Sequence, residues 1–281
     1  MDALEAWIER LEGDASLDAP ARLRERIDAL ERIERHYGPD DAAAAGGRVH
    51  ALRARLDAAN RALYQAVRED IRRGCGRDAL LPWRSAEASA VDAADGPIGE
   101  GYDALDELVA GVLRFDAPAE AAAPMPGMVG YQPTPARHAF DLLARLGLDR
   151  DDVLVDLGSG LGHVPLLAAI CTPACSVGIE IEPAYVACAR RSAGGLGLDN
   201  VAFRQQDVRG ADLSDATVFY LYTPFTGAIL RAVLDTLRGH AARRAIRICS
   251  FGPCTPVVAG ESWLQVAGPL QEDRIAVFHP R

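Results

Sequence analysis

The sequence predicts an α/β protein in which helices precede a mainly parallel β-sheet. Two observations lead to this fold class. In the first part of the chain, hydrophobic residues recur every three or four positions, which is the spacing of amphipathic helices. After residue 127, short hydrophobic runs alternate with helical stretches, as in a sheet built from strand–helix units. We therefore expect an all-helical N-terminal domain with a connector over residues 1–126 and an α/β domain over residues 127–281.

Two or three helices are expected within residues 1–73, where hydrophobic residues follow the helical spacing. Pro20 can begin the second helix, and the Gly38–Pro39 pair can end it. Helices of this kind bury their hydrophobic faces against one another, so we expect a small bundle.

The helical spacing is lost over residues 74–101, which are rich in glycine, proline and small residues and are interpreted as a connector. It returns over residues 102–115, where another helix is expected. An alanine- and proline-rich stretch over residues 117–127 then marks the expected domain boundary.

Seven strands are expected in the second domain. The last two are separated by too few residues for a helix, so we expect them to form an antiparallel edge. The strands are expected at residues 153–157, 176–180, 201–206, 217–222, 245–251, 263–267 and 275–279, and helices at 134–146, 163–170, 183–196 and 226–237.

Charge is distributed unevenly along the chain, and all 30 basic residues are arginine. Residues 1–126 hold 16 arginines against 25 acidic residues, a net charge of −9, whereas residues 127–281 hold 14 against 15, a net charge of −1. A total of −10 without clustered arginines disfavours nucleic acid and anionic membranes as partners. We therefore expect a small-molecule substrate, no nucleic acid and no membrane. The acidic first domain would also tolerate a cationic partner.

The compartment expected from the sequence is the cytoplasm. The first residues are acidic and do not resemble a secretory signal, and no hydrophobic run approaches the roughly 18 residues of a membrane span. The six cysteines include no C-x-x-C pair, so we expect reduced thiols and no metal site.

A glycine-rich turn follows the first expected strand, where residues 156–162 read Asp-Leu-Gly-Ser-Gly-Leu-Gly. Glycines let a ligand lie against the backbone, whose amides can donate to it. The dinucleotide pattern G-x-G-x-x-G would need glycine at the position of His163, and a phosphate-binding P-loop would need a lysine, which the chain lacks. A G-x-G-x-G turn after Asp156 suits a ligand that carries an amino group.

Two more acidic residues end the next two expected strands. Glu180 lies about 20 residues past the glycines, where an acidic residue binds ribose hydroxyls. Asp207 ends the third strand and is placed to accept a hydrogen bond from an adenine amino group. The carboxyl ends of parallel strands share one edge of the sheet, so we expect Asp156, Glu180 and Asp207 to meet in one crevice.

Residues 153–162, 178–183 and 206–208 resemble the first three motifs of class I S-adenosylmethionine-dependent methyltransferases, and the resemblance extends over roughly residues 128–281. It implies a Rossmann-like sheet of seven strands with helices on both faces and S-adenosyl-L-methionine as cofactor. It also implies the roles of individual residues: Asp156, Gly158, Ser159 and Gly160 would line the methionine moiety, Glu180 would hold the ribose hydroxyls, and Asp207 and Val208 would face adenine.

A second resemblance involves residues 131–135, which read Tyr-Gln-Pro-Thr-Pro, together with residues 156–164. They are similar to the loop and first motif of the non-SET histone-lysine methyltransferases and their bacterial relatives, in which the loop closes over the cofactor. This resemblance implies that Tyr131 and Thr134 contact the cofactor. It does not extend to histone as substrate, and Thr134 could equally be a helix N-cap.

Acceptor chemistry is expected at residues 220–225, at the end of the fourth strand. Amino-group methyltransferases of this class often have asparagine or aspartate where this chain has Thr223, so N-methylation is not inferred. Tyr222 is a candidate catalytic residue that could line the acceptor pocket or be a core aromatic. His163 is the candidate base, or else a histidine satisfied at a helix start.

These observations predict an enzyme that transfers a methyl group from S-adenosylmethionine to a small-molecule acceptor by in-line displacement, which mainly requires alignment in a dry site. Two alternatives stay open. The protein could use the cofactor for aminopropyl transfer or cyclisation, or it could bind the cofactor or a partner without catalysis.

Overall fold

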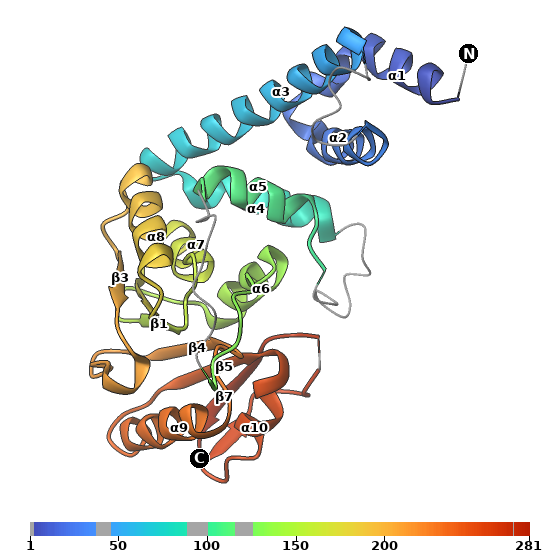
Figure 1. The fold of residues 1–281 in the computed structure, drawn as a ribbon. Helices are drawn as coiled ribbons and strands as arrows, with labels where there is room; N and C mark the ends of the chain where they lie inside the picture. Colours follow the sequence, from blue (N-terminus) through green and yellow to red (C-terminus); the bar gives the residue numbers. More distant parts are fainter. Residues whose placement is uncertain (1–2, 38–45, 89–100, 116–125, 272) are drawn as a thin grey trace. The chain divides into compact units, whose positions relative to one another are not determined.

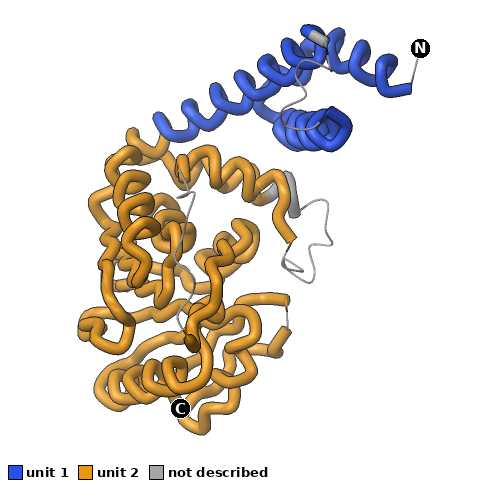
Figure 2. Tube along the Cα trace, viewed as in Figure 1, with its two compact units in different colours: residues 1–69 blue, residues 70–281 orange. Residues whose placement is uncertain are grey.

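The computed structural model describes residues 3–37, 46–88, 101–115, 126–271 and 273–281 (Figure 1). The chain divides into two compact units, residues 1–69 and residues 70–281 (Figure 2). Within the described ranges, no helix is both long enough and apolar enough to cross a membrane.

The first unit is helical, as predicted. Its helices are α1 (Ala3–Gly13), α2 (Leu23–Tyr37) and most of α3 (Gly46–Arg72), with the short 3₁₀ turns η1 (Ala15–Asp18) and η2 (Pro20–Arg22) between α1 and α2. Pro20 begins η2, which leads directly into α2. Gly38 and Pro39, predicted to end α2, lie outside the described residues. The three helices bury a shared core of Ile8, Leu17, Ala29, Ile33, Val49, Leu52 and Leu56.

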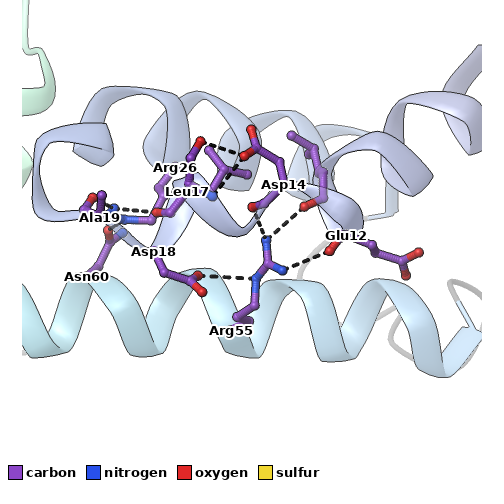
Figure 3. A network of polar contacts seen from close by, with 10 residues as sticks. Glu12, Asp14, Leu17, Asp18, Ala19, Arg26, Arg55 and Asn60 are labelled. Carbon is purple, nitrogen blue, oxygen red and sulfur yellow. Dashed lines mark hydrogen bonds and ion pairs between the residues drawn. The ribbon is translucent and has the colours of Figure 1, made fainter.

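A buried guanidinium lies inside this unit (Figure 3). Arg26 is 0% exposed; its Nε donates to Asn60 Oδ1 at 2.6 Å, and its Nη1 donates to the carbonyls of Leu17 at 2.7 Å and Ala19 at 2.6 Å. Burial lowers the pKa of Arg26. These bonds connect α2 to α3 and to the η1–η2 segment, where the Ala19 carbonyl also accepts from Arg22 N at 3.0 Å.

Arg55 of α3 stabilises the end of α1 (Figure 3). Its guanidinium donates to the carbonyl of Leu11 at 2.8 Å and to that of Glu12 at 3.0 Å. The last carbonyls of a helix have no partner within the helix and carry its negative dipole end, so a cation there is favourable.

The second unit contains the seven-stranded sheet, in the order β3-β2-β1-β4-β5-β7-β6. Strands β1 to β5 are parallel, and β7 runs antiparallel to both β5 and β6, which confirms the predicted antiparallel edge. The strands are β1 (Val153–Leu157), β2 (Cys175–Glu180), β3 (Val201–Gln205), β4 (Val218–Tyr222), β5 (Arg247–Phe251), β6 (Leu264–Val266) and β7 (Ala276–Pro280).

Helices pack on this sheet as strand–helix units require. The elements are α6 (Ala136–Leu146), α7 (His163–Cys171), α8 (Pro183–Leu196), η4 (Val208–Gly210), α9 (Gly227–Ala241), η5 (Gly252–Cys254) and α10 (Thr255–Ala259). The α7 helix lies against β1 and β2, and α8 lies against β2 and β3. The α9 and α10 helices share a core with the strands that includes Phe219, Leu234 and Phe278.

Two further helices of the second unit come before α6, namely α4 (Gly76–Ala88) and α5 (Ala104–Leu113). The prediction of a connector is therefore wrong for residues 76–88, while residues 89–100 are not among those described. Glycine and Pro82 obscure the helical spacing, and packing against α5 and α7 stabilises α4. A Cβ on Gly76 would lie 2.6 Å from Ile170, so the glycine permits this close approach.

The division into units differs from the boundary expected after residue 126, since it falls between Glu69 and Asp70. One reason is that α5 is tied to α6 by Asp106, whose carboxylate accepts from Asp103 N at 2.8 Å and from Ala136 N at 2.7 Å. The same carboxylate thus caps the first turns of both helices. Burial raises the pKa of Asp106 to about 6.

Replacing Arg26 with methionine is expected to destabilise the helical unit by about 2 kcal/mol, because Asn60 and two carbonyls lose their buried donor. Backbone amides of α1 and α2 should then exchange roughly 30-fold faster in hydrogen-exchange mass spectrometry. Arg35→Met, at an exposed position of α2, is the matched control and should change little. Equal exchange in both variants would mean that Arg26 does not hold the unit together.

Candidate active site

A cavity of about 270 Å³ lies at the carboxyl ends of β1, β2, β3 and β4. The order of the sheet reverses between β1 and β4, the point at which open α/β sheets bind their ligands. The cavity is lined by residues from four segments, 128–134, 156–164, 179–185 and 220–225, and by Gln206 and Val208. Its volume is close to the lower end of the range for small-molecule sites, about 300–1,000 Å³.

The glycine turn after β1 forms one wall of the cavity. Gly158 has φ 90°, and a Cβ there would lie 2.3 Å from Cβ of Pro224. Gly160 has φ 53°, and a Cβ there would lie 2.3 Å from Cε2 of Tyr131. Both the backbone conformation and the close neighbours therefore require glycine.

Glu180 joins the end of β2 to this turn. Its Oε2 accepts from Gly160 N at 2.8 Å, and its Oε1 accepts from Ile181 N at 2.7 Å and Glu182 N at 2.9 Å. An ionised carboxylate has about four acceptor positions, so this one keeps capacity for a ligand hydroxyl.

Asp156 lines the cavity and is 4% exposed. Burial, assisted by the nearby charge of Glu180, raises its pKa well above the ordinary value of an aspartate. Among the described residues, none donates a hydrogen bond to its carboxyl group. An ammonium group on a ligand would supply the missing cationic partner.

Two other residues that line the cavity each have a buried polar atom with no hydrogen-bond partner among the described residues, Oγ of Ser159 and Nε2 of Gln206. Buried polar atoms are nearly always paired, so each requires a partner from a ligand or water. Ser159 was predicted from the motif. Gln206 was missed, although the alternation of side chains along a strand could have distinguished it from its neighbours Gln205 and Asp207.

Asp207 is not among the residues that line the cavity, whereas Val208 is. The Asp207 carboxylate caps η4 by accepting from Arg209 N at 2.9 Å and forms an ion pair with the Arg209 guanidinium at 2.6 Å. These contacts lower the pKa of Asp207. Of the cofactor residues predicted from the sequence, the cavity brings together Tyr131, Thr134, Asp156, Gly158, Ser159, Gly160, Glu180 and Val208.

Residues 127–135, here called the strap, cover this region and are held at both ends. At its start, Val129 N donates to Pro224 O at 3.0 Å, and Gly127 O accepts from Thr226 N at 2.8 Å. At its end, Thr134 Oγ1 and Tyr220 OH share a buried hydrogen bond of 2.7 Å. The alternative reading of Thr134 as N-cap of α6 is wrong, because Pro135 occupies that position.

His163 lies under the strap at the start of α7. Its Nδ1 is 3.3 Å from the Tyr131 hydroxyl, and its ring centroid is 4.2 Å from that of Phe115. Burial lowers the pKa of His163 to about 3, so the imidazole is neutral near pH 7 and has little affinity for a proton. These contacts favour a role in holding Tyr131 over that of a general base.

The turn after β4 forms the remaining wall. Tyr222 lines the cavity, and its ring centroid is 4.7 Å from that of Phe251. Thr223 has φ 40°, a left-handed conformation that is uncommon outside glycine. Its hydroxyl donates to Phe251 O at 2.9 Å and accepts from Cys254 N at 3.0 Å, so it both donates and accepts hydrogen bonds within the protein.

The known proteins to which this chain is similar are methyltransferases. Residues 148–230 match a family model described as a methyltransferase domain. The RNA methyltransferase from Salinibacter ruber, solved with S-adenosyl-L-homocysteine, is 30% identical over 53% of this chain and 92% of that chain, with a TM-score of 0.43. No match was found among curated proteins.

Two other similar structures are more distant in sequence. An rRNA methylase from Streptococcus thermophilus is 12% identical over 54% of this chain and 99% of that chain, with a TM-score of 0.39. A SAM-dependent methyltransferase from Aquifex aeolicus is 15% identical over 50% and 88%, with a TM-score of 0.41.

The chain belongs to the class I S-adenosylmethionine-dependent methyltransferases, with S-adenosylmethionine as cofactor. Within that class, it is an enzyme whose Rossmann-like sheet is preceded by the helices α1 to α5.

A small-molecule acceptor is not confirmed by these comparisons. The expectation of no nucleic-acid partner is wrong, because a similar solved structure, 30% identical, is that of an RNA methyltransferase. That expectation came from the net charge of the whole chain, which does not describe the surroundings of the cavity.

His163→Gln is expected to reduce the acid sensitivity of the fold. In the wild type, His163 stays neutral in the native state down to a pKa of about 3, while its ordinary value of 6.5 applies after unfolding. The unfolded chain therefore binds the extra proton, and stability falls as the pH drops below about 6.5. The melting temperature of the variant should fall less between about pH 7 and about pH 5.

His279→Gln, on β7 and outside the cavity lining, is the control and should keep the wild-type pH dependence. If the melting temperature of His163→Gln also keeps the wild-type pH dependence, His163 titrates alike in the native and unfolded states and is not held neutral by burial.

Proposed function

We propose that the protein transfers the methyl group of S-adenosylmethionine to a planar, aromatic acceptor that binds at the end of the cavity lined by the turn after β4. The bound cofactor supplies a methyl group already activated by the sulfonium. The residues of the cavity have to bind it, orient it and exclude water, since alignment in a dry site is the main requirement for methyl displacement.

The cofactor end of the cavity supports this proposal through its chemistry. The buried carboxyl of Asp156 suits an ammonium group, the spare acceptor capacity of Glu180 suits ribose hydroxyls, and the unpaired Ser159 Oγ suits a polar group beside the glycine turn. The bare backbone at Gly158 and Gly160 lets the ligand lie close to the chain.

The acceptor end is inferred from what remains of the lining once these residues are assigned. The β4 end contributes Tyr220, Tyr222 and Phe225 to the cavity. Tyr131 and Tyr185 also line the cavity, and their ring centroids lie 5.0 Å apart. Aromatic walls favour a flat ring, which stacks on them with little loss of entropy.

The single observation that carries the proposal is that one cavity joins the cofactor residues to this aromatic end. RNA is the first acceptor to test, because its unpaired bases are planar and stack on aromatic side chains. The expected result is transfer of radiolabel from methyl-labelled cofactor to RNA, recovered in a modified nucleoside after nuclease digestion.

Separate incubations with a protein extract and with a small-molecule extract complete the experiment. Label recovered only on aliphatic acceptors would contradict the proposal. Release of 5′-methylthioadenosine in place of S-adenosylhomocysteine would instead indicate aminopropyl transfer or cyclisation.

Asp156→Ala and Glu180→Ala should each weaken binding of S-adenosylhomocysteine at least about tenfold, since each removes a charge-assisted hydrogen bond. Isothermal titration calorimetry measures this directly. Asp199→Ala, an exposed acidic residue outside the cavity, should bind as the wild type does. Wild-type affinity in both cavity variants would place the cofactor elsewhere.

A further inference from the structure

We infer that Asp106 of α5, which lies outside the cavity, is a positioning residue that holds the strap in its place over the cavity. The inference goes beyond the proposed function but rests on it, since the cavity is taken as the site of methyl transfer. Asp106 is not among the residues that line the cavity. Its Oδ1 accepts from Ala136 N at 2.7 Å, and Ala136 directly follows the strap. Asp106 therefore acts on a bound ligand through the position of the strap.

Two more contacts join the start of α5 to the end of the strap and the start of α6. The hydroxyl of Tyr102 donates to Pro133 O at 2.9 Å, and Asp103 forms an ion pair with Arg137 at 3.3 Å. The ion pair is partly buried, with 26% of the Asp103 side chain and 18% of the Arg137 side chain exposed, so salt screens it less than a surface pair. Together with the Asp106 contact, these bonds hold the end of the strap at three places.

The residue between these contacts, Thr134, reaches the cavity. It lines the cavity and shares the 2.7 Å hydrogen bond with the hydroxyl of Tyr220. Its two neighbours are Pro133 and Pro135, whose rings restrict φ, so this segment has few ways to bend between α5 and the cavity. A shift at Pro133 or Ala136 therefore moves Thr134 as well.

The charge of Asp106 strengthens this hold. An ionised carboxylate accepts amide hydrogen bonds roughly twice as strongly as a neutral group. Burial raises the pKa of Asp106 to about 6, against the hydrogen bonds from Ala136 N and Asp103 N, which lower it. Of the charged groups that act on this carboxyl, Asp103 raises the pKa and Arg137 of α6 lowers it. The carboxylate therefore gains a proton between about pH 7 and about pH 5, and its hold on the strap weakens.

Calorimetric titration of the full-length protein with S-adenosylhomocysteine at about pH 7.5 and about pH 5 tests the inference. Asp106→Asn should raise Kd roughly fivefold at the higher pH, since a strap that is held in place less of the time lowers the fraction of protein ready to bind. At the lower pH the wild type has lost the same charge, so the ratio of the two Kd values should approach one. Asp156 is present in both proteins, so its own titration cancels in this ratio.

Glu107→Gln is the matched control, because it makes the same carboxyl-to-amide change at the next residue of α5, which is exposed. Its Kd should stay within about twofold of the wild-type value at both pH values.

Tyr102→Phe is a second, milder variant. It removes only the hydroxyl that donates to Pro133 O, from a side chain that is 51% exposed, so the fold is retained. Its Kd should rise about threefold at the higher pH, because one of the three contacts with the end of the strap is lost.

Hydrogen exchange without ligand distinguishes a loosened strap from a destabilised fold. In Asp106→Asn, peptides covering residues 127–135 should exchange several-fold faster than in the wild type, whereas peptides of α9 should exchange at the wild-type rate.

Three results would overturn the inference. Wild-type exchange of residues 127–135 in Asp106→Asn would show that Asp106 does not hold the strap, and faster exchange of α9 as well would make it a residue of the general fold. The same Kd ratio at both pH values would show that its charge has no part in positioning. Failure of the wild type to bind S-adenosylhomocysteine would instead overturn the proposed function, while the exchange comparison, made without ligand, still decides whether Asp106 holds the strap.

Discussion

The carboxylate of Glu180 joins the ends of two neighbouring strands, and the geometry of the site depends on this contact. Through Gly160 it fixes the turn after β1, and through the next two amides it fixes the start of the segment after β2. The strap and the turn after β4 then pack directly on that glycine turn, at distances that leave no room for a side chain. Glu180 at the end of β2 therefore links, directly or through the glycine turn, the four segments that line the cavity.

Much of the fold could be predicted, because the parallel strands are short hydrophobic runs ended by turns. Residues 153–157 were predicted as a strand with the bounds that β1 has, and the other six strands differ by one or two residues at one or both ends. The α4 helix could not be predicted, since Gly76 and Pro82 break its pattern and contacts distant in sequence stabilise it. Tertiary packing outweighs local propensity there.

The site was predictable where a residue acts through its backbone or its charge, as at Gly158, Gly160 and Asp156. The site was less predictable where neighbouring residues in the sequence are candidates for the same role. Only the structure shows that Asp207 forms an ion pair with Arg209 while Gln206 lines the cavity. Likewise, only the structure shows that the Thr223 hydroxyl donates to the carbonyl of Phe251 at the end of β5. His163 is adjacent to the glycines in sequence, yet burial removes the basicity on which a catalytic role would depend.

A crystal structure with S-adenosylhomocysteine tests the central claim most directly, namely that the edge formed by β1, β2 and β4 binds the cofactor. The expected result is a ligand with its amino group at Asp156, its ribose hydroxyls on Glu180 and its chain along Gly158 and Gly160. A ligand bound outside this cavity, or no ligand at saturating concentration, would contradict the claim.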